Sequence, residues 1–293
     1  MDLATLVPLG LKASVAFLVL GLGLEATFED ALSLFRKPMQ LLRSLFAINI
    51  VMPLFAVLLA IVFDLHPAVK IALVALAVSP VPPILPRKQG KAGGRRSYAI
   101  GLLVAAGLLA IIFVPLAVEL LGRGFGTDSH ISITAVAKLI VMTIIGPLLT
   151  GLILCAFLPA FAERIVRPIS LIATLLLFSC ALLVLFSSWA AIVSLIGNGT
   201  IVAIAAFVMV GLLTGHLLGG PAGEDRSVLA LATAAHHPGI ALAIATANFP
   251  ERKLAPAAVI LYLIVMVIVT SFYVMWRKRH AEIDNTIATA KGS

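Results

Sequence analysis

The chain is a succession of long apolar stretches separated by short polar ones. A hydrocarbon core of about 30 Å is crossed by about 20 residues of helix, and roughly nine stretches of suitable length can be placed. They are residues 3–24, 40–63, 67–86, 97–121, 131–157, 168–188, 201–218, 227–247 and 255–276. This pattern predicts an all-α integral membrane protein with about nine transmembrane helices.

The third and the eighth of these stretches are interrupted near their middle. The interruptions read Ser79-Pro80-Val81-Pro82-Pro83-Ile84-Leu85-Pro86 and His236-His237-Pro238-Gly239. Proline lacks a backbone donor and clashes with the preceding turn, so the freed polar groups must face protein or a watery cavity. Paired broken helices of this kind indicate the binding site of a secondary transporter.

Composition supports a membrane protein and excludes several other classes. Hydrophobic residues make up 61% of the chain, charged residues 12%, and the mean hydropathy is +1.15. We interpret the net charge of +8 as topological sorting and contact with anionic lipid headgroups, not as nucleic-acid binding. Cys155 and Cys180 lie in apolar stretches, where we expect packing residues and no disulfide.

The 21 Lys and Arg residues are distributed unequally between the two sides of the membrane. With the N-terminus outside, only Lys70, Arg123, Arg252 and Lys253 fall in outer loops. The positive-inside rule therefore predicts a multi-pass protein of the inner cell membrane, with its N-terminus outside and its C-terminus in the cytoplasm. The first stretch lacks a basic leader region and contains Lys12, so we expect it to be retained as a span.

The broken stretches are an odd number of spans apart and must cross in opposite directions, as in an inverted repeat. We expect one transmembrane transporter domain over residues 1–293. Its parts are a first repeat (1–121), a linker span (122–166), a second repeat (167–276) and a cytoplasmic tail (277–293).

Several motifs distributed along the chain carry a resemblance to a known family. They are Gly21-Leu22-Gly23-Leu24, Glu29-Asp30, Met52-Pro53-Leu54, Ser79-Pro80, Val114-Pro115-Leu116 and Pro238-Gly239-Ile240-Ala241-Leu242-Ala243. The chain resembles bacterial members of the bile acid:sodium symporter family over nearly its whole length. The resemblance implies panel and core domains, two broken helices crossing in the core, and transport of small organic anions such as bile acids or other carboxylates. Members of the family usually have ten spans, so with about nine we expect the family's usual first span to be missing here.

The sequence departs from this family at the positions that bind sodium. Sodium-coupled members carry a glutamate and a Gln-Asn pair on the second broken helix, and a Ser-Asn pair on the first. In this chain those positions fall near Ala232, near His236-His237, and near Leu85 and Pro86. The resemblance therefore implies that the usual sodium sites are replaced.

Ligand chemistry leads to the same expectation. Sodium, like other hard cations, is best bound by several oxygens that include a carboxylate. All 13 acidic residues lie in termini, loops or segment ends. Backbone carbonyls of residues 79–83 and near Ala235 would remain as weak ligands. We do not expect sodium coupling through the usual sites.

His236 and His237 indicate a proton as a different coupling ion. Ionisable residues within a span are rare, and imidazole, with a reference pKa of about 6.5, exchanges protons near neutral pH. The alternative is that both are neutral and bonded to carbonyls freed by Pro238. Neighbours on a helix point about 100° apart, so only one would face a site unless the backbone is unwound. His216 is expected to bond a neighbouring helix.

A basic, glycine-rich stretch follows the first break. It contains Arg87, Lys88, Lys91, Arg95 and Arg96. One interpretation is a cytoplasmic loop that sets topology. The other is a cationic inner mouth that attracts a carboxylate or lipid headgroups, with Arg87 nearest the site. In either case we expect the second half of this broken helix to be shortened or melted.

Together these features predict a secondary transporter of a small organic anion that works by alternating access. The alternative is a non-transporting sensor or a channel-like facilitator on the same scaffold. Catalysis is not expected and no cofactor is implied, because His236-His237 lacks a carboxylate partner and the i, i+4 spacing of helical zinc ligands. The residues expected at the crossing are Ser79, Pro80, Pro82, Pro83, Pro86, Arg87, Thr233, His236, His237, Pro238 and Gly239.

Overall fold

The computed structural model describes residues 3–292, and the side chains of residues 6–280. The first half contains α1 (Leu3–Leu24), α2 (Phe28–Leu32), α3 (Pro38–Phe46), η1 (Ala47–Val51), α4 (Met52–Val62), α5 (Pro67–Ala77), α6 (Leu85–Lys91) and α7 (Arg96–Gly124). The second contains α8 (Ile133–Ile140), η2 (Val141–Ile145), α9 (Gly146–Phe157), α10 (Pro159–Ser187), α11 (Trp189–Ser194), α12 (Thr200–Leu218), α13 (Gly223–Ala234), α14 (Pro238–Asn248) and α15 (Ala255–Gly292). Among the described residues every regular element is helical, as predicted.

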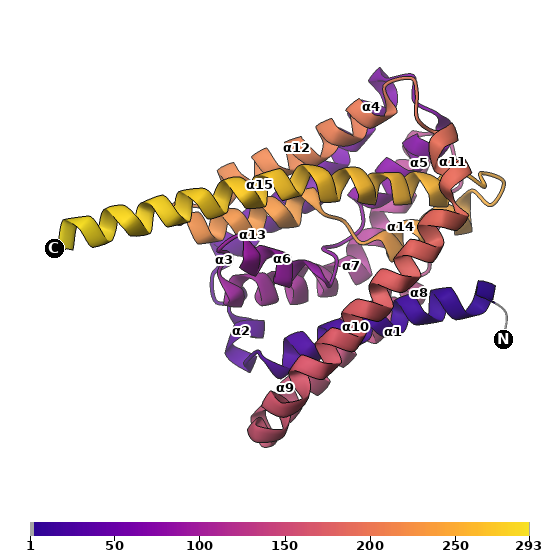
Figure 1. Ribbon diagram of the computed structural model, residues 1–293. Helices are drawn as coiled ribbons and strands as arrows, with labels where there is room; N and C mark the ends of the chain where they lie inside the picture. The colour runs from indigo at the N-terminus through magenta and orange to yellow at the C-terminus, as the bar shows by residue number, and fades with distance from the viewer. Residues whose placement is uncertain (1–2, 293) are drawn as a thin grey trace.

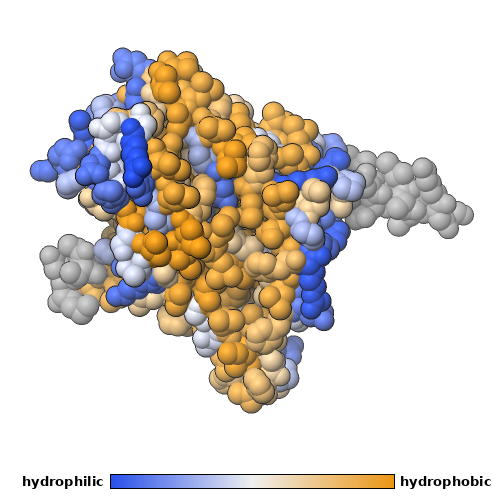
Figure 2. Space-filling model, turned by 180° about the vertical axis from the view of Figure 1, so that it is seen from behind, coloured by the Kyte–Doolittle hydropathy of each residue, from blue (hydrophilic) through white to orange (hydrophobic). Residues whose placement is uncertain are grey.

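Within the part of the chain that the structure describes, eight helical segments are long and apolar enough to cross a membrane, by length and composition. The remaining predicted stretch is the pair α5 and α6, which are each too short to span alone. Figure 2 shows a broad hydrophobic surface over the middle of the molecule, with hydrophilic side chains gathered toward its two ends. This distribution is that of a multi-pass membrane protein.

Two helices extend beyond the spans predicted from the sequence. Helix α10 begins at Pro159, before the predicted span of residues 168–188, so Arg164 and Arg167 lie on this helix. Pro168, the first residue of that predicted span, lies inside α10, because a membrane helix can tolerate the loss of one backbone donor. At the C-terminus, α15 continues through residue 292 as one helix. The polar tail is thus helical, contiguous with the last span.

Two spans widen into one turn of π-helix just before a proline. These turns are η1, followed by Pro53, and η2, followed by Pro147. A proline inside a helix crowds the carbonyl of the residue four positions earlier. A local π-turn relieves that crowding without ending the span.

The helices form two groups (Figure 1). The small group consists of α1, the α8–η2–α9 span and α10, in which α1 packs along both α9 and α10. Gly23 and Gly151 let α1 and α9 approach closely: a Cβ on Gly151 would lie 2.5 Å from the carbonyl oxygen of Leu20. The large group contains α3 to α7 and α12 to α15. It holds both broken helices.

Candidate functional site: the crossing of two broken helices

Both predicted breaks are present, and they touch. The backbone is unwound at residues 79–82, between α5 and α6, and at residues 235–237, between α13 and α14. The backbone N–H of His237 donates to the carbonyl oxygen of Pro80 at 2.8 Å. Nδ1 of His236 lies 3.3 Å from the carbonyl oxygen of Ser79. We call these two unwound stretches the crossing.

Tyr262, on α15, completes the hydrogen bonding of the second break. Its hydroxyl accepts from the backbone N–H of His236 at 3.1 Å and donates to the carbonyl oxygen of Ala234 at 2.9 Å. Its side chain is fully buried, with its ring edge-on to Phe207. Sequence reasoning missed this residue. A tyrosine inside an apolar span is itself a signal, because a buried hydroxyl needs a partner.

The bond of His236 to Ser79 fixes its tautomer. A carbonyl oxygen only accepts, so Nδ1 of His236 carries the proton and Nε2 holds the free lone pair. The ring is completely buried beside Phe207, with centroids 5.3 Å apart. Nε2 has no hydrogen-bond partner within residues 6–280. His236 therefore presents a buried, unused proton acceptor.

His237 has the opposite tautomer. Its Nδ1 accepts from the backbone N–H groups of Gly239 (3.1 Å) and Ile240 (3.4 Å), which caps α14 and places the proton on Nε2. This Nε2–H also has no partner among the described side chains and backbone. A Cβ on Gly239 would lie 3.1 Å from the His237 ring, so the glycine leaves room for the ring to fold back over the helix end. The unwound backbone allows both adjacent histidines to lie in the crossing.

The other predicted residues determine the backbone conformation of the crossing and do not point free polar groups into it. Ser79 donates its hydroxyl to Ala75, and Thr233 to Leu229, each one turn back on its own helix. Pro238 is the first residue of α14, where its missing N–H costs nothing. The prolines of the first break are buried in the structure. They are Pro80, Pro82, Pro83 and Pro86.

The positions at which the resemblance led us to expect sodium ligands carry no side-chain oxygen. Leu85, Pro86 and Ala232 are buried and apolar, and the carbonyls of Ser79 and Pro80 already interact with the histidines. In the part of the chain whose side chains are described, no three His, Cys, Asp or Glu side chains gather into a metal-ligand cluster. This donor set does not fit a hard cation.

The first part of the basic stretch, through Lys91, lies in a short helix, α6, of 7 residues, so the half-helix is shortened and not melted. Arg95 and Arg96 lie at the start of α7. Arg87 donates to the hydroxyl of Ser170 on α10 at 2.6 Å, and Lys88 donates to Thr270 on α15. Gln89 is buried and donates to the carbonyl oxygen of Val228 on α13 at 2.8 Å. Arg87 thus connects the large group to the small group.

Arg95, Arg96 and His216 also have partners. Arg95 pairs with Asp225 at 3.1 Å, and Arg96 pairs with Glu25 at 3.8 Å. His216 bonds the hydroxyl of Tyr273 on α15 at 2.9 Å, as expected for a packing histidine. Side chains of this stretch therefore bind neighbouring helices.

Three glycines that the sequence analysis overlooked bring α12 against α13. Gly211, Gly215 and Gly219 recur every fourth residue, the spacing of a small-residue helix interface in membranes. A Cβ on Gly215 would lie 2.5 Å from Cα of Ala230. This close contact holds the first half of the second broken helix in place.

An all-helical membrane protein whose two broken helices meet at buried, unwound backbone has the architecture of a secondary transporter. The chain matches the model of the Sodium Bile acid symporter family over residues 13–195, and it belongs to that family. The matched region includes the first break and ends before α12, so it does not reach the second break. No curated protein matches the chain.

Proposed function

We propose that this protein is a secondary transporter of a small organic anion, with the crossing as its substrate site. The observation that carries the proposal is the contact between the two breaks, where two buried histidines each present an unpartnered Nε2. Buried polar atoms without partners are rare in folded proteins and cluster where a ligand completes them. Family membership supports the transporter class.

The geometry favours a negatively charged substrate. The N-terminal end of α14 lies at the crossing, and its dipole stabilises negative charge. The Nε2–H of His237 is a free donor beside that helix end. A carboxylate placed there accepts a hydrogen bond and interacts favourably with the helix dipole.

We further propose that the coupling ion is a proton accepted by Nε2 of His236. The lone pair on this atom is free, so protonation breaks no existing hydrogen bond, and the imidazolium balances the charge of a bound anion. The lone pair of His237 is already used in capping α14. Sodium coupling is not proposed, because Leu85, Pro86 and Ala232, which the resemblance places at sodium-binding positions, have no side-chain oxygen.

Alternating access then consists of movement of the large group against the small group. The small group comprises the first, fifth and sixth predicted spans, and the large group contains the two broken helices. The proposal includes an inverted repeat of residues 1–121 and 167–276, which would place the two breaks on opposite-running spans. Inverted repeats of this kind give the two access states similar energies and opposite openings.

The proposal is tested by uptake of a labelled organic-acid panel into proteoliposomes, with proton and sodium gradients imposed separately. We expect accumulation of a carboxylate under a proton gradient alone. The double variant His236→Gln/His237→Gln should lose proton-driven uptake, while His216→Gln, which changes a histidine bonded to Tyr273 away from the crossing, should retain it. Monodisperse elution of each variant shows that it is folded.

Other results would contradict parts of this proposal. Sodium-driven accumulation would show that backbone oxygens suffice for sodium and would overturn the proton assignment. Undiminished proton dependence in the double variant would remove the histidines from coupling. Equilibration without accumulation would indicate a channel-like facilitator, and absence of flux for every acid would indicate a sensor.

A further inference from the structure

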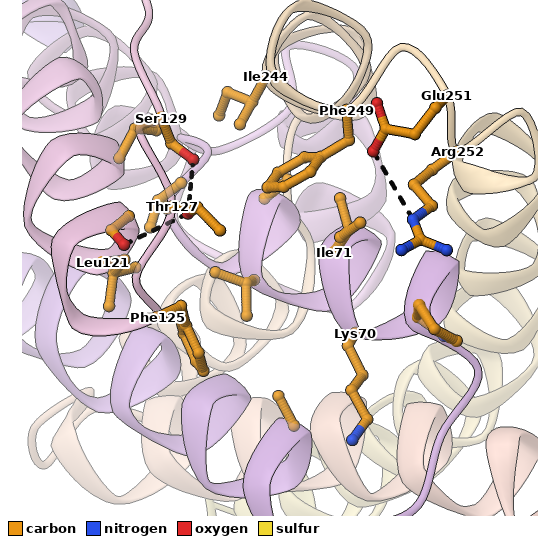
Figure 3. Close-up of a pocket in the computed structure, with 17 residues that line it drawn as sticks. Lys70, Ile71, Leu121, Phe125, Thr127, Ser129, Ile244, Phe249, Glu251 and Arg252 are labelled. Carbon is orange, nitrogen blue, oxygen red and sulfur yellow. Dashed lines mark hydrogen bonds and ion pairs between the residues drawn. The ribbon is translucent and has the colours of Figure 1, made fainter.

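A second candidate site lies in a cavity of about 530 Å³ within the large group. Its walls come from α4, α5, the C-terminal end of α7 with the segment after it, and the C-terminal end of α14 with the loop before α15 (Figure 3). Lys70 and Arg252, which belong to the side predicted to be outside, are both on the wall. The volume is in the range that encloses small organic ligands.

The lining combines apolar walls with cationic groups. Ile71, Val74 and Phe249 contribute apolar surface, and Figure 3 shows Phe249 beside the Glu251–Arg252 pair, with Lys70 lying apart from it. Nε of Arg252 lies 3.7 Å from Oε1 of Glu251, so the charges of these two side chains nearly cancel. Lys70 is half-buried and forms no hydrogen bond or ion pair with any described residue. The cavity therefore has one uncompensated positive charge.

The backbone adds to this positive character. Helix α5 begins at Pro67, which also lines the cavity, and Lys70 follows in its first turn. The N-terminal end of a helix carries partial positive charge. An anionic group near Lys70 would interact with both the ammonium and the helix end.

The cavity is not the crossing. Its deepest residues on α5, Ala75 and Val78, lie within one turn of Ser79, but its lining contains no residue of residues 79–82 or 235–237. None of its lining comes from α1, α9 or α10. A cavity lined only by helices of the large group keeps the same opening when that group moves as a unit against the small group. Such a cavity does not alternate between the two sides.

We infer that this cavity is a separate, outward-facing binding site for an organic anion with an apolar body. The apolar walls hold the body, and Lys70 binds the anionic group through a charge-assisted hydrogen bond. The inference concerns equilibrium binding and does not depend on transport, on proton coupling or on the crossing histidines.

The test is equilibrium binding of 2-naphthoate, with neutral 2-naphthamide as a matched probe of the same shape. Binding is measured by saturation-transfer NMR on the full chain in lipid nanodiscs, with empty nanodiscs subtracted. Lys70→Gln should weaken naphthoate binding about tenfold and leave naphthamide binding unchanged, as expected for loss of one hydrogen bond to a charged group. Lys253→Gln removes an exposed cation that does not line the cavity and should change neither.

A second variant tests the cavity itself. Val74→Trp fills the apolar wall and should abolish binding of both probes, whereas Ile61→Trp, at an exposed position on α4, should not. The inference is overturned if Lys70→Gln and Val74→Trp both bind naphthoate as tightly as the unmodified protein does. It is also overturned if Lys253→Gln weakens binding as much as Lys70→Gln, which would indicate general surface charge. In the His236→Gln/His237→Gln variant, the part of naphthoate binding that Lys70→Gln removes should persist, so that loss of binding at the crossing and loss of this site are distinguished.

Discussion

His237 donates its backbone N–H to the carbonyl oxygen of Pro80 across 2.8 Å, joining the two broken helices directly. Each break leaves backbone groups without helical partners, and lipid offers none. In this protein each break supplies part of what the other lacks. One hydrogen bond between backbone atoms joins the two breaks, and the side chains of His236, His237 and Tyr262 complete the bonding of the crossing.

The hydroxyl of Tyr262 should be important for the stability of the crossing. Tyr262→Phe removes the bridge between the N–H of His236 and the carbonyl oxygen of Ala234, leaving two buried backbone groups unpaired. We expect a loss of about 2–3 kcal/mol, seen as a lower thermal unfolding temperature of the purified protein. Tyr273→Phe is the matched control. It loses one bond to His216 in a less buried place, so an equal effect of both variants would contradict this assignment.

The contact between α12 and α13 should not accommodate a methyl group. Gly215→Ala would place Cβ 2.5 Å from Cα of Ala230, and backbone cannot move aside as a flexible side chain can. We expect a loss of about 3 kcal/mol, as for a strongly overpacked core, measured by thermal unfolding. Gly90→Ala is the control because its Cβ would meet nothing within 4 Å. The Gly90→Ala substitution should be neutral or slightly stabilising. If Gly215→Ala unfolds at the same temperature as the unmodified protein, α12 and α13 are farther apart than described here.

Capping of α14 by His237 can be separated from its exchangeable proton. His237→Ala removes the acceptor for the N–H groups of Gly239 and Ile240 and should cost about 1 kcal/mol. His237→Asn keeps a capping acceptor but has no titratable group, and should restore most of that stability. Chemical unfolding of both variants gives the comparison. If Asn fails to restore stability, the ring of His237 acts mainly by packing.

The bond from Arg87 to Ser170 should favour the conformation described here. Ser170→Ala removes the acceptor, and we expect the population of this conformation to fall several-fold, about 1 kcal/mol. Distances between spin labels on α6 and α10 would report the shift. Thr174→Ala, one turn along α10, removes a hydroxyl that bonds only the carbonyl of Ser170 and should leave the distances unchanged. Identical distance distributions in Ser170→Ala and the unmodified protein would exclude a role for this bond.

The sequence predicted the breaks well because proline acts locally. Pro80, Pro82 and Pro83 cannot sit in a continuous helix, nor can Pro238 extend α13, whatever surrounds them. The same reasoning failed at Pro168, which lies inside α10. Whether one proline ends a helix depends on the neighbouring turns and helices, and those are not visible in a linear pattern.

Tertiary partners could not be predicted in the same way. In a soluble protein, apolar periodicity shows which face is buried, but here lipid-facing and protein-facing positions are both apolar. The hydropathy pattern does not indicate that Tyr262 bonds to His236, 26 residues away. Arg87 was placed near the site on charge alone, whereas its bond to Ser170 depends on how α6 meets α10.

The contact between the two breaks also constrains how the chain is made. The carbonyl of Ser79 and the ring of His236 are separated by 157 positions, so the first break leaves the ribosome long before its partner exists. During that interval residues 79–82 have exposed backbone groups in or beside the bilayer, where nothing satisfies them. Membrane insertion of α5 and α6 therefore cannot be finished at the time of their synthesis. It is completed only when α13 and α14 arrive, and until then the insertion machinery or water must shelter the first half.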